Sequence, residues 1–152
     1  MPNMVTAWVG DLSVVVHGPS TPSSAEWSDY IRLCKELSRR WEAGEKVAQL
    51  VVTAGGGPNL EQRRDARAAA GESLVPVAVV SDSAFARFVV NASVRMRMNV
   101  TCRAFAPGEL DDALRYLAVE GTEEVSRCIA RLQEALTQKK TRASSRRTAR
   151  GR

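Results

Sequence analysis

The sequence predicts an α/β domain with a mixed, mostly parallel sheet flanked by helices, followed by a C-terminal helix and a disordered basic tail. Short segments rich in β-branched residues alternate with segments whose apolar residues recur every three or four positions. Two of the strand-like segments are apolar almost throughout, as in strands that are covered on both faces. Strands that alternate with helices pair in parallel through right-handed crossovers.

The first two strands form a predicted hairpin. Residues 6–11 and 12–17 are rich in β-branched residues and meet at Gly10 and Asp11. Gly18 and Pro19 end the second strand. We expect this hairpin at the edge of the sheet.

The first helix begins at a capping box, in which Ser23 is the N-cap and Glu26 follows three positions later. Gly44 provides its end. One face of the helix is apolar and must pack on the sheet. The residues of that face are Trp27, Ile31, Cys34, Leu37 and Trp41.

Residues 47–53 are nearly all apolar, which predicts a strand in the centre of the sheet. Three glycines and Pro58 interrupt the pattern after this strand. Asn59, with Gln62 three positions later, then caps a second helix that ends at Gly71. Residues 75–80 form the next buried strand.

Two more helices and a strand complete the domain. Ser81, Asp82 and Ser83 offer N-caps for a third helix, and residues 100–105 form a short alternating strand. A fourth helix follows residues 107–108 and ends at Gly121. The inward faces of these helices are Phe85, Phe88, Val89, Ala92 and Met96 in the third, which Asn99 closes, and Leu110, Ala113, Leu114 and Leu117 in the fourth.

A last amphipathic helix opens at Thr122 and runs into a basic tail. We therefore divide the chain into an α/β domain over residues 1–121, a C-terminal helix over 122–137 and a disordered tail over 138–152. If the last helix projects from the domain, its apolar stripe predicts a homo-oligomer. The stripe consists of Val125, Ile129, Leu132 and Leu136.

The net charge of +5 arises entirely in the tail. The last 15 residues hold seven cations and no acid, which leaves 15 cations against 17 acids, or about −2, in the rest of the chain. Affinity for nucleic acid or an anionic membrane therefore belongs to the tail, and a solubilising extension is the alternative. The cations are Lys139, Lys140, Arg142, Arg146, Arg147, Arg150 and Arg152.

Compartment and cofactors follow from composition. No apolar stretch approaches the roughly 20 residues of a membrane span, and the N-terminus lacks the features of a secretory signal, so we expect a cytoplasmic protein. Three widely spaced cysteines suit reduced, buried thiols. A single histidine, His17, excludes a multi-histidine metal site, and we expect no metal and no cofactor.

The order of elements and four segments carry a resemblance to a known family. The segments are VVVHGPSTPSSAEW over residues 14–27, LVVTAGGGPN over 50–59, VPVAVVSDS over 75–83 and RAFAPGELDDAL over 103–114. Over about residues 6–119 the chain resembles the STAS fold of anti-sigma-factor antagonists, and more closely its bacterial STAS/SEC14-like (SpoIIAA-like) branch. The resemblance implies a non-enzymatic signalling module that binds a protein partner.

Phosphoregulated STAS proteins carry a serine or threonine at the start of the helix after the central strand, and its phosphorylation breaks the partner interface. In this chain residues 55–60 have no hydroxyl group, and Thr53 lies at the strand end instead. We therefore do not expect this chain to share the regulation by phosphorylation of those STAS proteins.

Several polar groups should converge at the carboxyl ends of the strands, where open α/β sheets form crevices and helix N-termini favour anions. The glycine turn at residues 55–57 has two interpretations: it contacts a ligand there, or it is a flexible turn. It lacks the motif of a P-loop and that of a dinucleotide site. His17 is either a general base beside Ser81 and Asp82 or a structural or partner-facing residue. Asp82 also fits a helix cap.

Three functions remain open. The first is a partner-binding module that uses the surface of residues 55–67, whose arginines alternatively form a solvated, salt-bridged face. The second is a binder of a small anionic ligand or lipid, or an enzyme, at the crevice. The third is a nucleic-acid or membrane tether through the tail. The residues expected at the partner surface or crevice are His17, Thr53, Gly55, Gly56, Gly57, Asn59, Arg63, Arg67, Ser81 and Asp82.

Overall fold

The computed structural model describes residues 2–71, 73–95 and 101–149, without the side chains of residues 85, 89, 93–95 and 139–149. The positions of Met96, Asn99, Arg150 and Arg152, and the inward placement of Phe85 and Val89, thus lie outside the described part. The described elements are β1 (Met4–Val9), β2 (Leu12–His17), α1 (Ser24–Glu42), β3 (Ala48–Thr53), α2 (Leu60–Ala70), β4 (Val77–Ser81), α3 (Ala84–Arg95), β5 (Cys102–Phe105), the 3-10 turn η1 (Pro107–Glu109), α4 (Leu110–Tyr116) and α5 (Thr122–Ala149).

The strands form one sheet in the order β1-β2-β3-β4-β5. β1 pairs antiparallel with β2 through a turn at Gly10, and every other pair is parallel. This confirms the predicted α/β fold with a hairpin at the edge of a mixed sheet and residues 48–53 in the central strand.

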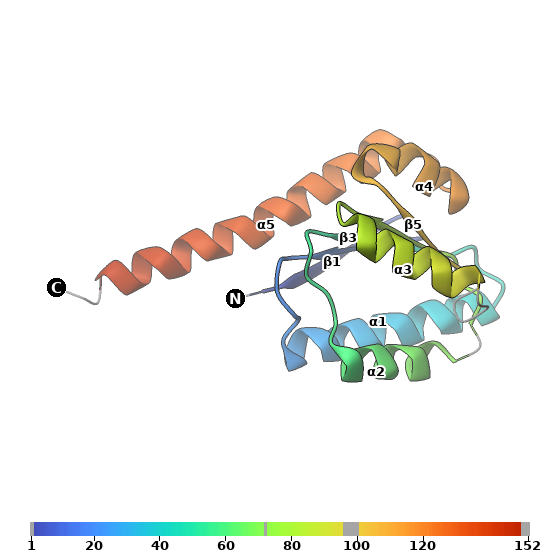
Figure 1. Ribbon diagram of the computed structural model, residues 1–152, viewed down its shortest axis with the longest axis horizontal. Helices are drawn as coiled ribbons and strands as arrows, with labels where there is room; N and C mark the ends of the chain where they lie inside the picture. The colour runs from blue at the N-terminus through green and yellow to red at the C-terminus, as the bar shows by residue number, and fades with distance from the viewer. Residues whose placement is uncertain (1, 72, 96–100, 150–152) are drawn as a thin grey trace.

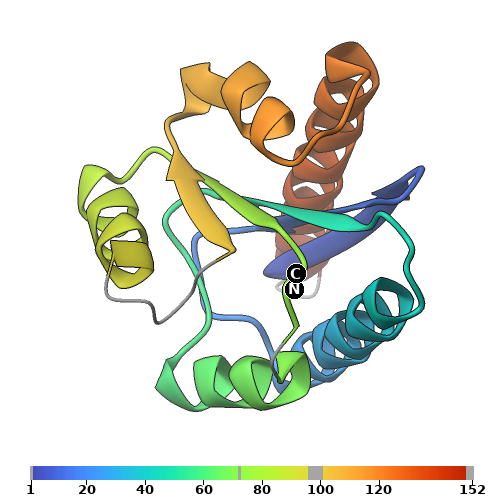
Figure 2. The ribbon, with the colours of Figure 1, turned by 90° about the vertical axis from the view of Figure 1, so that its right-hand side faces the viewer.

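Helices cover both faces of the sheet (Figures 1 and 2). α1 and α2 lie side by side on one face, where Trp27 packs with Met4 and Val15. α4 and α5 lie on the other face, and their buried Leu114, Val125 and Leu132 join the main apolar core. The buried strands are therefore sandwiched between two helical layers, as their continuous apolar sequences require.

α3 lies beside the edge strand β5 rather than over a face of the sheet (Figure 2). The side chain of Asn91 accepts a hydrogen bond from the backbone N–H of Ala104 at 3.0 Å. A helix that satisfies an edge strand in this way protects it from pairing with another chain.

The last helix begins on the sheet and extends well past it (Figure 1). Val125 and Cys128 are buried against the main core, and Leu136 packs at its margin. The apolar stripe thus packs on the sheet and does not project, which was the condition for the predicted homo-oligomer. The helix also continues to Ala149, beyond the expected end at residue 137, because no glycine or proline interrupts the sequence before Gly151.

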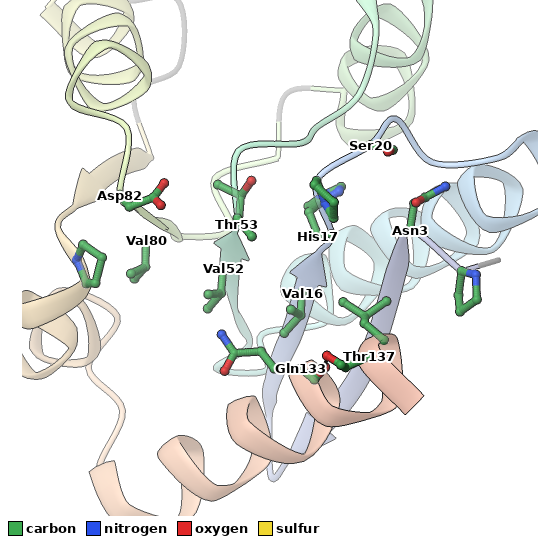
Figure 3. A pocket seen from close by; sticks show the side chains of 16 residues that line it. Asn3, Val16, His17, Ser20, Val52, Thr53, Val80, Asp82, Gln133 and Thr137 are labelled. Atoms are coloured by element: carbon green, nitrogen blue, oxygen red, sulfur yellow. Dashed lines mark hydrogen bonds between the residues drawn. The ribbon is translucent and has the colours of Figure 1, made fainter. Parts of the chain in front are cut away.

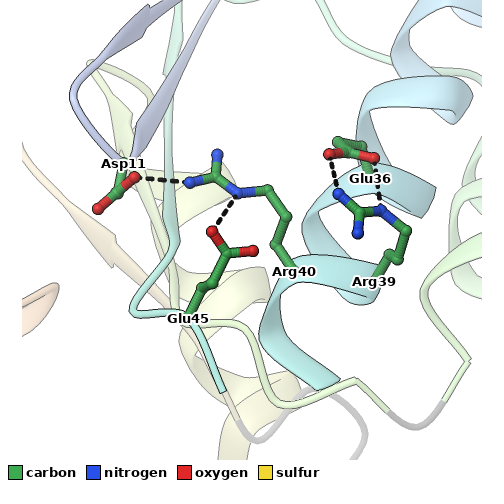
Figure 4. A network of polar contacts seen from close by, with 5 residues as sticks. All are labelled: Asp11, Glu36, Arg39, Arg40 and Glu45. Carbon is green, nitrogen blue, oxygen red and sulfur yellow. Dashed lines mark hydrogen bonds and ion pairs between the residues drawn. The ribbon is translucent and has the colours of Figure 1, made fainter. Parts of the chain in front are cut away.

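The end of α1 is fixed by Arg40 (Figure 4). Its guanidinium bonds Asp11 in the β1–β2 turn at 2.6 Å and Glu45 in the following loop at 3.3 Å, and it lies 4.9 Å from the ring centre of Trp8. The neighbouring Arg39 pairs with Glu36 on its own helix. Arg40 therefore ties three segments together.

All three cysteines are free thiols, and Cys128 is buried as predicted, whereas Cys34 and Cys102 are only partly buried. Burial raises the pKa of Cys102 to about 11 and also raises the pKa of Cys34, so both thiols stay protonated at neutral pH. Within the described residues, no helix has the length and apolar character needed to cross a bilayer.

Candidate functional site

A cleft of about 610 Å³ opens at the carboxyl edge of the parallel strands (Figure 3). It lies between the ends of β2, β3 and β4 and the middle of α5. The expected convergence is present, since His17, Thr53, Asp82 and Pro107 all line this cleft. Cavities of this size hold small molecules in many proteins.

The floor of the cleft is apolar. Val16, Val52 and Val80 are register partners on three adjacent strands, so their side chains share one face of the sheet. Figure 3 shows the three side chains projecting toward the helix that carries Gln133 and Thr137. Leu136 completes the apolar lining.

His17 forms part of the wall and is 4% exposed. Its Nδ1 has no hydrogen-bond partner among the described residues. Burial lowers the pKa of His17, and the nearby carboxylate of Glu26 opposes this shift only in part. The imidazole is therefore neutral at pH 7.

The glycine turn after β3 is held from both sides. Thr53 Oγ1 donates a hydrogen bond to the Gly56 carbonyl at 2.5 Å and accepts one from the Gly55 N–H at 3.2 Å. Gly56 packs so closely on the segment 18–20 that a Cβ would collide with the Gly18 carbonyl and lie 2.7 Å from the Ser20 nitrogen. This packing argues against the flexible turn that the sequence left open.

Ser81 and Asp82 occupy different environments. Ser81 is a register partner of Thr53, is 2% exposed, and its Oγ accepts a hydrogen bond from the Ser83 N–H. Asp82 is exposed at the cleft rim. Neither residue makes a described hydrogen bond to His17, so the structure does not show the acid–base pairing considered above. Ser83 caps α3, because its Oγ accepts from the Ala86 N–H.

The start of α2 is a second ordered surface. Asn59 and Gln62 form the predicted capping box, and Gln62 Nε2 also donates to the Pro22 carbonyl at 3.0 Å. Arg63 donates to the Pro58 carbonyl. Arg63 and Arg67 are exposed and lie on this helix, outside the cleft.

The expected salt-bridged face is not seen on α2. Within the described residues, no ion pair joins Arg63, Arg64 or Arg67 to an acid. Leu60, on the first turn, is 67% exposed. α2 therefore presents arginines, the carboxylates of Glu61 and Asp65 and one large apolar side chain to solvent.

The cleft carries little positive charge. Asp82 and the neutral His17 are its ionisable lining residues in the described part of the chain, and no lysine or arginine lines it there. The described residues also contain no cluster of three or more histidine, cysteine or acidic side chains that could hold a metal ion.

Sequence reasoning missed one wall of the cleft. Gln133, Leu136 and Thr137 of α5 line it, as do Pro2 and Asn3 at the N-terminus. The sequence shows that α5 is amphipathic, but not that it lies along the carboxyl ends of the strands. Asn3 is held there because its N–H donates to Glu26 and its carbonyl accepts from the Gly18 N–H.

Seven cations were assigned to the tail. Five of them, between residues 139 and 147, lie on the described backbone of α5, beyond the part that packs on the sheet (Figure 1). The helix therefore extends the basic segment away from the core.

Comparisons of the chain with protein-family models, curated proteins and solved structures found no match. The likeness to STAS domains therefore rests on the order of the elements and on the segments quoted above.

Proposed function

We propose that this chain is a non-enzymatic, STAS-like regulatory module of the bacterial cytoplasm that binds a protein partner. Its binding surface comprises the glycine turn and helix α2, over residues 55–67, and is called here the α2 surface. The observation that carries the proposal is an exposed Leu60 among arginines that form no ion pair with the described residues, on a rigidly held element.

Rigidity supports this proposal because a preordered surface loses little conformational entropy when it binds. Gly56 is packed against residues 18–20, and Thr53 closes the turn. Gln62 fixes the first turn of α2 to the segment that precedes α1. Hydrogen bonds thus hold the α2 surface in place on both sides of the glycine turn, at Thr53 before it and at Gln62 after it.

The exposed groups indicate the chemistry of the partner. Leu60 offers apolar area to a pocket, and aliphatic side chains in such positions bury surface on binding. Arg64 and Arg67 form no ion pair within the described part of the chain, and their guanidinium groups can form bidentate bonds with carboxylates. An acidic protein surface with an apolar pocket matches this arrangement.

A photo-crosslinking amino acid at position 60, introduced into the full chain in the cells that produce it, tests the proposal. We expect one stoichiometric adduct, which mass spectrometry identifies. The purified partner should then bind the wild type, and Leu60→Asp should weaken binding by tenfold or more in calorimetry.

Leu74→Asp is the matched control, since Leu74 is also exposed, at 58%, but lies in the segment before β4. It should leave the affinity within about twofold of the wild type. Equal weakening by both changes, or no adduct at position 60, would contradict the proposal.

The long basic extension of α5 favours a second function, attachment to a polyanion. Its cations stand on a helix that runs beyond the core, where they can reach DNA or an anionic membrane (Figure 1). Full-length protein should bind DNA or anionic vesicles in a salt-dependent way, and a chain ending at Gln138 should not. Equal binding by both chains would show that the tail is not the segment that binds the polyanion.

A further inference from the structure

The cleft at the carboxyl edge of the strands adjoins the glycine turn, does not include helix α2, and is built for a different kind of ligand. Its apolar floor is fixed by strand register, because Val16, Val52 and Val80 occupy one row of the sheet. Val52 is the partly exposed member of this row, whereas Val16 and Val80 are 2% and 5% exposed, and Leu136 of α5 adds further partly exposed apolar area. A short alkyl chain fits against Val52 and Leu136.

The rim of the cleft is polar. Asn3 and Ser20 lie on one side of it, Asp82 on another, and Gln133 and Thr137 face the floor from α5 (Figure 3). The buried His17, with its unpartnered Nδ1, stands in the wall between the floor and the loops. A ligand that fits the cleft therefore has an apolar part and a polar end.

Charge decides what that polar end can be. The described lining holds one carboxylate, from Asp82, and no lysine or arginine. A carboxylate or phosphate would meet the like charge of Asp82, and no lysine or arginine lines the cleft in the described part of the chain, so the anionic ligand expected from sequence does not suit this lining.

We propose that the cleft binds a small amphipathic molecule with a neutral or positively charged head group that donates hydrogen bonds. Its apolar part lies against Val52 and Leu136, and its head group lies at the rim beside Asp82. Binding here is independent of the partner interaction at the α2 surface.

Three decyl compounds of equal chain length test this proposal, namely decylammonium, 1-decanol and decanoate, each below its micelle concentration at pH 7. Titrations followed by ¹H–¹⁵N NMR should give the tightest binding for decylammonium, about 2- to 5-fold tighter than for decanol, as expected for one partly solvated ion pair. Decanoate should bind most weakly. Shifts should concentrate at Val16, Val52, Val80 and Gln133.

Two variants make the result specific. Asp82→Asn should bring decylammonium to within about twofold of decanol, because it removes the carboxylate and keeps the size of the side chain. Asp111→Asn, an exposed change on α4, should change no affinity. Val52→Thr keeps the fold and volume but places a hydroxyl on the floor, and it should weaken all three compounds about threefold or more.

The proposal is overturned if decanoate binds most tightly, if no probe binds, or if Val52→Thr changes nothing. It is also overturned if the shifts lie at the opposite end of the sheet, where a second cleft of about 600 Å³ is lined by Leu117, Val119 and Glu120. Loss of partner binding in Leu60→Asp leaves all these outcomes unaffected, so the two proposals fail separately.

Discussion

At the scale of single residues, three consecutive glycines have different roles. Gly55 adopts a positive φ of 99°, Gly56 is packed against the backbone of residues 18–20, and Gly57 has open space around its Cα. The sequence cannot separate them, because the difference arises from a segment almost forty positions away in the chain.

Gly56→Ala should destabilise the fold by about 1–3 kcal/mol, because its methyl group overpacks a backbone contact that has no flexible side chain to yield. Urea denaturation measures this change. Gly57→Ala is the matched control and should stay within about 0.5 kcal/mol of the wild type. Similar losses for both substitutions would show that the turn does not pack as described.

His17 links stability to pH. Its pKa is lowered in the folded state, so the unfolded chain binds more protons near pH 6 and stability falls as the pH drops below about 6.5. The slope cannot exceed about 1.4 kcal/mol per pH unit for one proton. Since the chain has no other histidine, His17→Gln should flatten the dependence between pH 5.5 and 6.5.

Denaturation midpoints of both proteins across that pH range provide the measurement. A wild type whose stability is constant there, or a His17→Gln variant with the same slope, would show that the imidazole is not desolvated.

At the scale of elements, the local sequence predicts well where a helix begins, but it predicts poorly which distant segments that helix contacts. The capping boxes of Ser23 with Glu26 and of Asn59 with Gln62 appear as predicted, because both partners lie within one turn. The bond from Gln62 to Pro22 crosses 40 positions and leaves no local pattern. The strands were found because β-branched runs reflect burial on both faces.

The end of α5 shows a different limit. Residues 138–149 lack large apolar side chains, which indicates disorder, yet they also contain no helix-breaking residue. In the structure the backbone continues as helix through Ala149. Composition alone does not choose between these outcomes.

The first half of α5 belongs to the core of the domain. A chain ending at Gly121 loses the buried Val125 and Leu132, which alone contribute about 3–6 kcal/mol, a large part of the stability of a small domain. It should unfold or expose apolar surface to a fluorescent dye. A chain ending at Gln138 keeps these contacts and should melt within a few degrees of the full chain.

Thermal unfolding of the two truncated chains, followed by circular dichroism, makes the comparison. A stable, cooperatively folded chain ending at Gly121 would show that the sheet does not need α5.

At the scale of the whole molecule, helix α2 and helix α5, which forms one wall of the cleft, lie on opposite faces of the sheet (Figure 2). The fold class and the central position of residues 48–53 follow from sequence, and so does the meeting of His17, Thr53 and Asp82 at one edge. Two features depend on which face of the sheet each helix covers: the wall that α5 adds to the cleft, and the exposure of Leu60 on α2, in the other helical layer. An amphipathic pattern does not show which face a helix covers.

The central claim is that the α2 surface binds a protein partner. Hydrogen exchange of the full chain, alone and with the partner captured through position 60, tests it most directly. The account predicts slower exchange on complex formation for amides in residues 55–67, with residues 133–137 unchanged. Protection confined to the cleft or to α5, with residues 55–67 exchanging as in the free chain, would contradict it.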